Sequence, residues 1–245
     1  MKNLVEVKNL KKNYGTKKAV RDISFNIKEN EILGLLGPNG SGKTTTIGML
    51  LGLLKPSYGE ILIDGKKIEE NRIETLQKIN FISPYIELPK KLTVRQNLIV
   101  YCKLYNVINI KKRIEYLVEK LRLNDLLNNV TGELSSGQKN RVSLAKALIN
   151  NPTVLFLDEP TASLDPEVGD YVRSFLENYK KENKISILLA SHNMNEVTRL
   201  CKTVLMMKEG IIIDKGDPEE LIKKHGRKNL EEVFLKLSRS KDEFY

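Results

Sequence analysis

A short glycine-rich run carries the clearest chemical signal in this 245-residue chain. Residues 37–44 read GPNGSGKT and match the phosphate-binding pattern G-x-x-x-x-G-K-[ST]. Its glycines permit backbone angles that turn N–H groups inward, where these groups and a helix N-terminus bind phosphate oxygens. Lys43 is expected to reach the β- and γ-phosphates of a nucleotide, and Thr44 to offer its hydroxyl to Mg²⁺. The predicted nucleotide contacts are Gly37, Pro38, Asn39, Gly40, Ser41, Gly42, Lys43, Thr44 and Thr45.

The segments on either side support this prediction. The run EILGLL at 31–36 predicts a buried strand, and TTTIGMLLGLL at 44–54 predicts the helix that receives the phosphates. The alternative is a chance glycine-rich turn in front of a helix. The order strand, loop, helix favours the phosphate-binding interpretation.

Two adjacent acids follow a second apolar run. Residues 154–159 read VLFLDE, which predicts a central strand that carries its last side chains to the edge of the sheet where ligands bind. Asp158 is expected to hold Mg²⁺ through water, and Glu159 to polarise the attacking water. The alternative is a solvated strand end before Pro160. The presence of the phosphate-binding run favours the metal-binding and catalytic interpretation.

A second helix N-terminus fit for an anion lies between these two motifs. Residues 133–152 read ELSSGQKNRVSLAKALINNP, in which small residues open a strongly amphipathic helix. Little side chain obstructs the backbone N–H groups at this end.

The elements that must position these motifs favour an α/β fold. Short β-branched or leucine-rich runs alternate with amphipathic runs. Apolar and polar residues alternate in the first predicted strands, and turns separate these strands. This pattern predicts an antiparallel β subdomain at the N-terminus. The predicted strands are 4–7, 20–27, 31–36, 60–63, 79–82, 154–157, 185–190, 204–207 and 211–214.

Helical segments complete the expected organisation. Residues 93–129 have no strand signal and predict two or three helices, and 218–237 predicts a final helical pair. We therefore expect a P-loop NTPase core, a mostly parallel sheet flanked by helices, with a helical subdomain inserted into it. The expected single domain covers 1–245, with the β subdomain and core in 1–82 and 152–215, the helical subdomain in 83–151 and the C-terminal helices in 216–245.

Composition places the chain among soluble globular proteins. Its 40% hydrophobic and 29% charged residues are ordinary, the apolar runs are too short to cross a bilayer, and no signal peptide is visible. The formal net charge of +10 favours anionic partners, but the lysines are scattered and aromatic residues are few, so we expect no nucleic-acid partner. Cys102 and Cys201 lack a metal-like spacing and are expected to be buried.

Taken together, the motifs resemble those of the ATP-binding subunits of ABC transporters, over essentially the whole chain. LSSGQ at 134–138 resembles the signature LSGGQ of that family, and SLD at 163–165 resembles its D-loop. His192 resembles the switch histidine, and Tyr14 occupies the place of an aromatic residue that stacks on adenine. The alternatives are a buried core histidine and a surface tyrosine.

The resemblance implies ATP hydrolysis with Mg²⁺ in a head-to-tail pair of such chains. Ser135, Gly137 and Gln138 would contact the γ-phosphate held by the facing chain. Asp165 would line the shared interface, and His192 would contact the γ-phosphate. Whether the pair is two copies of this chain or two different chains stays open.

The resemblance also implies a separate membrane-spanning permease. The ending at 216–237 is similar to exporter-type subunits that pair with type-2 permeases, which favours export. The segment with Pro84, Tyr85 and Leu88 lies where the family docks its membrane partner. The chain would then be held at the cytoplasmic face of the cell membrane.

The sequence departs from the family pattern at two positions. Ser136 replaces a glycine of the signature, and its small hydroxyl side chain is compatible with phosphate binding. Pro84 stands where the family has a glutamine that touches Mg²⁺ and the attacking water, and Gln77 and Gln96 are out of register with it. We therefore expect Thr44, Asp158 and Glu159 to position metal and water with less help than usual.

Two other functions were weighed against a transport motor. A non-transport ATPase of the same superfamily, acting on ribosomes or DNA, would usually carry two such domains, coiled coils or zinc modules. A binding-only regulatory subunit would fit the change at Pro84, but Lys43, Asp158, Glu159 and His192 are all present.

Overall fold

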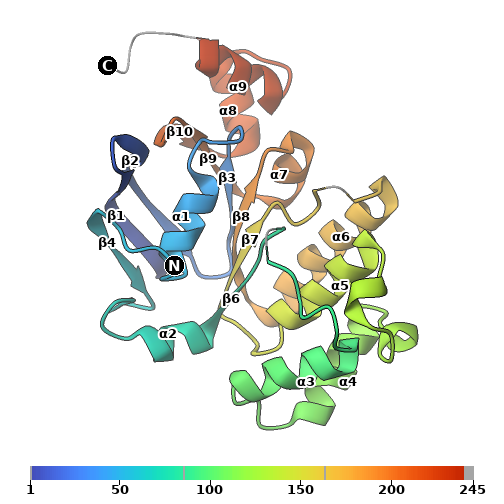
Figure 1. Ribbon diagram of the computed structural model, residues 1–245. Helices are drawn as coiled ribbons and strands as arrows, with labels where there is room; N and C mark the ends of the chain where they lie inside the picture. Colours follow the sequence, from blue (N-terminus) through green and yellow to red (C-terminus); the bar gives the residue numbers. More distant parts are fainter. Residues whose placement is uncertain (1, 85, 163, 240–245) are drawn as a thin grey trace. The chain divides into compact units, whose positions relative to one another are not determined.

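The computed structural model describes residues 2–84, 86–162 and 164–239. Tyr85 of the expected docking segment and Ser163 of the D-loop-like motif therefore lie outside the described residues. The chain forms two compact units (Figure 1), and each is described by itself. Unit 1 comprises residues 1–75 and 186–245, and unit 2 comprises residues 76–185.

Unit 1 begins with an antiparallel sheet of strand order β2-β1-β4-β5. Apolar residues alternate with polar ones along the first two strands, so each strand buries one face and exposes the other. The antiparallel β subdomain predicted at the N-terminus is confirmed. Its strands are β1 (Asn3–Tyr14), β2 (Lys17–Lys28), β4 (Tyr58–Ile63) and β5 (Lys66–Lys67).

A second group of strands in unit 1, in the order β10-β9-β3-β8, carries the phosphate-binding run. The central strand β3 (Ile32–Leu36) is buried at every position, as its unbroken apolar sequence predicts. It runs parallel to β8 (Ser186–Ser191) and to β9 (Thr203–Lys208), whereas β10 (Ile211–Gly216) pairs antiparallel with β9. The carboxyl ends of β3, β8 and β9 consequently meet at one edge.

The helices of unit 1 follow these strands in the chain. Helix α8 has Asp217 as its N-cap and ends at Gly226, whose φ of 61° is left-handed. The Asp214 carboxylate on β10 pairs with Lys224 (2.8 Å) and His225 (2.6 Å), and these contacts fasten α8 to the sheet. The helices are α1 (Lys43–Leu50), α2 (Arg72–Lys78, which runs into unit 2), α7 (Met194–Leu200), α8 (Pro218–His225) and α9 (Leu230–Arg239).

Unit 2 combines one parallel strand pair with a helical layer. Strand β6 (Ile79–Ile82) pairs in parallel with β7 (Val154–Asp158), with Ile82 opposite Leu157. Helix α3 begins at a capping box between Thr93 and Gln96, in which each side chain bonds the backbone of the other residue. The remaining elements are α3 (Val94–Leu104), α4 (Ile110–Lys120), η1 (Asn124–Leu126), η2 (Thr131–Glu133), α5 (Ser136–Ala147) and α6 (Pro166–Asn183).

The strand and helix predictions agree with the structure, with differences at the ends. Strands β1 and β2 are each 12 residues long, which is longer than predicted. Antiparallel pairing continues through polar residues as far as the pair Tyr14 and Lys17 at the hairpin. The sequence analysis did not identify the short β5, α2 or the 18-residue α6. Cys102 and Cys201 are both buried, as expected.

Candidate functional site

The glycine-rich run forms the connection between β3 and α1. Gly40 and Gly42 have φ values of 82° and 110°, so two of the three glycines provide the left-handed backbone that the pattern requires. Gly42 is the N-cap of α1, and the first turn of that helix contains no acidic residue. The positive end of the helix dipole is therefore not opposed by a local carboxylate, which favours an anionic ligand.

Gly37 is required for a different reason from the one predicted. Its φ is not positive, and a Cβ atom there would lie 2.2 Å from the carbonyl oxygen of Met207 on β9. The expectation that all three glycines supply unusual backbone angles was wrong for this residue. Gly37 instead allows the loop to pass against the neighbouring strand.

Lys43 is held inside the loop it belongs to. The residue is 5% exposed, and its Nζ donates hydrogen bonds to the carbonyl oxygens of Gly37 (2.7 Å) and Pro38 (3.2 Å). The ammonium group therefore lies where the loop backbone converges. Thr44 is exposed and Thr45 half-buried in the first turn of α1.

The parallel register of unit 1 brings His192 to the same edge. Leu36 of β3 pairs with Ser191 of β8, so the residues that follow them, Gly37 and His192, leave the sheet side by side. His192 is exposed, which excludes the alternative of a buried core histidine.

Tyr14 lies at the end of β1 in the hairpin that leads into β2. Its side chain is 46% exposed, and Lys12 Nζ lies 5.0 Å from the centroid of its ring. The start of β2 is close to the phosphate-binding loop, because a Cβ on Gly42 would lie 2.7 Å from the carbonyl oxygen of Ala19. The phosphate-binding loop, His192 and the hairpin that contains Tyr14 therefore all belong to unit 1.

Unit 2 contains the two acids. Asp158 is 1% exposed at the end of β7, and Glu159 follows it with a left-handed φ of 51°. A non-glycine residue in this region costs about 1–3 kcal/mol, and such strain is concentrated at functional sites. The strained backbone gives Glu159 a direction different from that of the buried strand residues before it.

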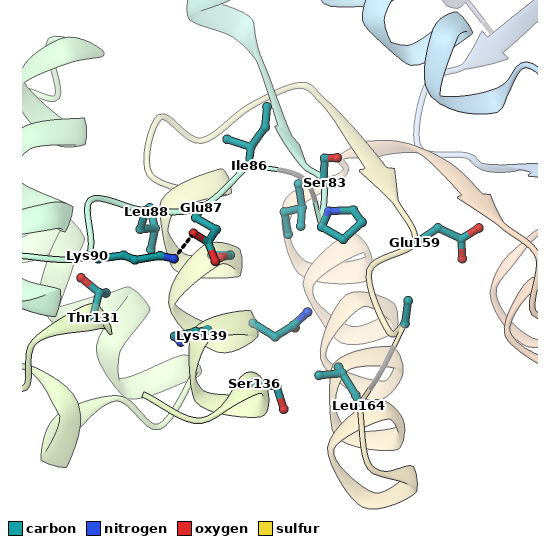
Figure 2. A pocket seen from close by; sticks show the side chains of 15 residues that line it. Ser83, Ile86, Glu87, Leu88, Lys90, Thr131, Ser136, Lys139, Glu159 and Leu164 are labelled. Carbon is teal, nitrogen blue, oxygen red and sulfur yellow. Dashed lines mark ion pairs between the residues drawn. The ribbon is translucent and has the colours of Figure 1, made fainter. Parts of the chain in front are cut away.

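A cavity of about 220 Å³ in unit 2 is lined by Glu159 and by the segment that follows β6 (Figure 2). Ser83 and Pro84 line it together with Glu159, because Ile82 and Leu157 are paired residues of the two preceding strands. Ser136 on α5 also lines the cavity. Pro84 therefore shares a cavity with the predicted catalytic acid.

Polar contacts hold the walls of this cavity in place. Glu87 and Lys90 form an ion pair of 2.6 Å (Figure 2), and the hydrogen bond from Lys90 lowers the pKa of the Glu87 carboxyl. Asn140 of α5 donates a hydrogen bond of 2.7 Å to the carbonyl oxygen of Pro160, directly after Glu159. The helix of the signature-like motif is thereby tied to the acidic segment.

The signature-like residues form the N-terminus of α5. Ser135 is its N-cap, and a capping box links Ser135 and Gln138 in both directions, at 3.3 and 2.9 Å. Gly137 lies against α6, since a Cβ there would approach Val168 to 3.2 Å. These residues line a groove of about 360 Å³ together with Arg122, Arg141, Glu167, Val168 and Tyr171.

Asp165 begins α6 and is exposed, with Pro166 as the first helical residue. Its carboxylate makes no cap to its own helix. It is therefore at the surface of unit 2.

Three groups with clear structural roles were not found by sequence reasoning. Lys146 on α5 is buried, and Ser191 and Glu196 are buried around His192. Lysine, serine and glutamate are ordinarily surface residues, and nothing in the local sequence marks these three as exceptions.

Comparison with known proteins gives a consistent result. The family model described as "ABC transporter" matches residues 20–162. The chain is 38% identical over 220 residues to the Nod factor export ATP-binding protein I of Burkholderia orbicola (strain AU 1054), covering 89% of this chain and 72% of that protein. It is 37% identical over 234 residues to the bacitracin transport ATP-binding protein BcrA of Bacillus licheniformis, covering 94% and 75%.

A solved structure with the same fold is a dimeric ATP-binding cassette in a post-hydrolysis state, bound to ADP and Pi. The TM-score is 0.79 at 27% sequence identity, and the match covers 87% of this chain and 98% of that one. The similarity therefore extends over both units of the chain.

Proposed function

The chain belongs to the ABC transporter family, and from this premise we propose that it powers export through a separate membrane-spanning permease, using Mg²⁺-ATP. It is an ATP-binding and ATP-hydrolysing transport subunit. The proposal adds the direction of transport, the metal, the permease and the location, which is the cytoplasmic face of the cell membrane. None of the helices in the described part of the chain has the length and apolarity needed to cross a membrane.

The observation that carries the chemistry is the parallel register of unit 1. The glycine-rich loop, Lys43 and His192 are brought to one sheet edge by the pairing of Leu36 with Ser191. A loop of N–H donors, a helix N-terminus and a lysine suit a triphosphate, and His192 at the same sheet edge would contact the γ-phosphate.

Mg²⁺ fits the oxygen donors that the chain offers. In nucleotide sites it is held by one or two carboxylates together with substrate phosphates and water. Unit 2 offers the Asp158 carboxylate at the end of a buried strand, and unit 1 offers the Thr44 hydroxyl; each is a donor of that kind. When bound, the ion would neutralise charge on the phosphates, while Glu159 would orient the attacking water.

The signature-like helix supports a working dimer. The N-terminus of α5 has no acidic residue in its first turn and lines a groove that contains two arginines, Arg122 and Arg141, and one acid, Glu167. Such a surface suits a phosphate held by a second subunit. Ser135, Gly137 and Gln138 would then act on the nucleotide of the facing chain.

Exposed apolar side chains in unit 2 support a permease partner. Val100 and Leu104 are exposed four residues apart on α3, Leu104 is 65% exposed, and the exposed Ile108 follows beyond the end of the helix. Ile86, two residues after Pro84, is also exposed. A helix of a membrane partner that lays its apolar face on these residues would bury them.

The test compares purified wild-type protein with Glu159→Gln. We expect wild type to release phosphate from ATP with Mg²⁺, and the variant to bind ATP with a turnover lower by a factor of at least about 100. Tagged Glu159→Gln protein, extracted from gently solubilised membranes with ATP, should bring down a multi-span membrane protein in matching amount. Recovery of ribosomes or DNA instead would overturn the transport assignment.

The same comparison tests the alternative of a binding-only regulatory subunit, which was suggested by Pro84, a residue in the cavity lined by Glu159. In that case wild type and Glu159→Gln would bind ATP equally and show the same negligible phosphate release.

A further inference from the structure

Three hydrogen bonds link the residues on either side of His192 to Glu196 and to each other. Ser191 Oγ donates to Glu196 Oε2 at 2.8 Å, and the backbone N–H of Asn193 donates to Ser191 Oγ at 3.0 Å. The backbone N–H of Glu196 in turn donates to Asn193 Oδ1 at 3.2 Å. The residues before and after His192 are thus both linked to the same glutamate.

Burial of this glutamate is unusual for a residue on a short helix. Glu196 is 1% exposed and Ser191 0% exposed, whereas His192 between them is at the surface. A buried carboxylate is costly unless hydrogen bonds compensate its desolvation. Burial raises the pKa of the neighbouring Cys201 thiol, and the negative charge of Glu196 raises it further.

Capping of α7 does not account for the arrangement. Asn193 already caps the helix by accepting from the N–H of Glu196, so the bond between Ser191 and the glutamate carboxylate is additional. Its effect is to fix the last residue of β8 to α7. The direction in which the chain leaves the sheet at His192 is set by these two anchors.

We propose that Glu196, acting through Ser191, is a positioning residue for His192. The inference rests on the proposed function, in which His192 contacts the γ-phosphate. An exposed side chain needs a fixed backbone to meet a phosphate repeatedly with the same geometry, and a displacement of about 1 Å can cost about 100-fold in rate.

The chain offers a matched control on the same strand. Ser186, at the other end of β8, is also 0% exposed, accepts from the N–H of Asn30 at 2.9 Å and donates to the carbonyl of Lys28 at 3.0 Å. Ser186→Ala and Ser191→Ala therefore each remove a buried hydroxyl with one donated and one accepted bond. Only the second lies next to His192.

The first readout is the NMR signal of the histidine ring, which does not depend on hydrolysis. The chain has only two histidines, so His192→Gln assigns the Cε1–H resonance of His192 directly. We expect Ser191→Ala to shift or broaden this resonance and Ser186→Ala to leave it as in wild type. Glu196→Gln, which keeps an acceptor oxygen for Ser191, should preserve the resonance, whereas Glu196→Ala should change it.

The second readout is ATP turnover. Ser191→Ala is expected to lower kcat about tenfold while KM for ATP changes less than about twofold, because binding groups are untouched. Ser186→Ala should keep the wild-type kcat even if it lowers the melting temperature equally.

The outcomes separate the inference from the proposed function. An unchanged His192 resonance in Ser191→Ala and Glu196→Ala, or equal changes in Ser186→Ala, would overturn the positioning role. If Ser191→Ala does not fold, the Glu196→Gln and Glu196→Ala pair decides by the same criterion. Absence of hydrolysis by wild type, with the expected NMR changes present, would refute the proposed function and leave the positioning role supported.

Discussion

Lys146 provides a prediction whose size follows from the structure. It lies on α5 and is 8% exposed, with Nζ 4.5 Å from the ring centroid of Phe81 and 5.6 Å from that of Tyr101. Nζ also donates to the carbonyl oxygen of Phe81 at 3.0 Å. Burial lowers the pKa of Lys146 from its ordinary value of 10.5 to about 8.

This difference makes folding stability depend on pH. Between pH 8 and 10.5 the unfolded chain binds a proton at this lysine that the folded chain has released, so the free energy of unfolding rises with pH. Below pH 8 both states are charged, and the full cost of burying the charge is present. A pKa of about 8 against 10.5 gives a change of about 2.5 kcal/mol between pH 7 and pH 10.

The perturbation is Lys146→Met, which removes the titrating group and keeps an unbranched side chain that packs well against Phe81 and Tyr101. The assay is urea unfolding of both proteins at intervals from pH 7 to pH 10. Titration of other groups is common to both proteins, and burial raises the pKa of Tyr101 above its ordinary 10. The difference in unfolding free energy should therefore move by about 2.5 kcal/mol in favour of wild type as pH rises.

A second variant makes the reasoning refutable. Lys146→Arg keeps a cation that does not titrate in this range. The free energy of unfolding of wild type should therefore rise relative to that of Lys146→Arg over the same pH interval. A difference between wild type and Lys146→Met that stays constant from pH 7 to pH 10 would show that Lys146 does not lose its proton, and the argument from burial would be wrong.

Three further predictions concern ATP use and docking. Pro84→Gln should raise Mg²⁺ affinity or turnover sharply, because Pro84 shares a cavity with Glu159 and has no donor or acceptor side chain; an unchanged titration of turnover against Mg²⁺ would count against this. Tyr14→Ala should weaken ATP binding by about 1–2 kcal/mol if the ring stacks on adenine, measured by calorimetry, with Tyr14→Phe as the control that keeps the ring. Leu104→Glu should abolish recovery of the permease while leaving phosphate release by the isolated protein intact, because the residue is 65% exposed on α3 and remote in sequence from the nucleotide motifs; retained co-purification would remove α3 from the docking surface.

Local chemistry made the main elements readable in advance. The buried strands β3, β7 and β8 appear in the sequence as unbroken apolar runs, and the α3 cap appears as Thr93 followed by Gln96. Helix α6 was not predicted, although Pro166 opens it and its buried residues Val172, Phe175, Leu176 and Tyr179 recur at helical spacing.

The sequence by itself determined the phosphate-binding loop, the strand ends and the helix caps, because their requirements act over a few neighbouring residues. Tertiary structure alone decided why Gly37 must be glycine, since the obstacle is a carbonyl of Met207, 170 positions away. It also decided that Lys146 and Glu196 are buried, and that Lys146 donates to the carbonyl of Phe81, 65 positions away. Burial and nonlocal hydrogen bonds depend on which surfaces meet when the chain packs, and no local pattern encodes that meeting.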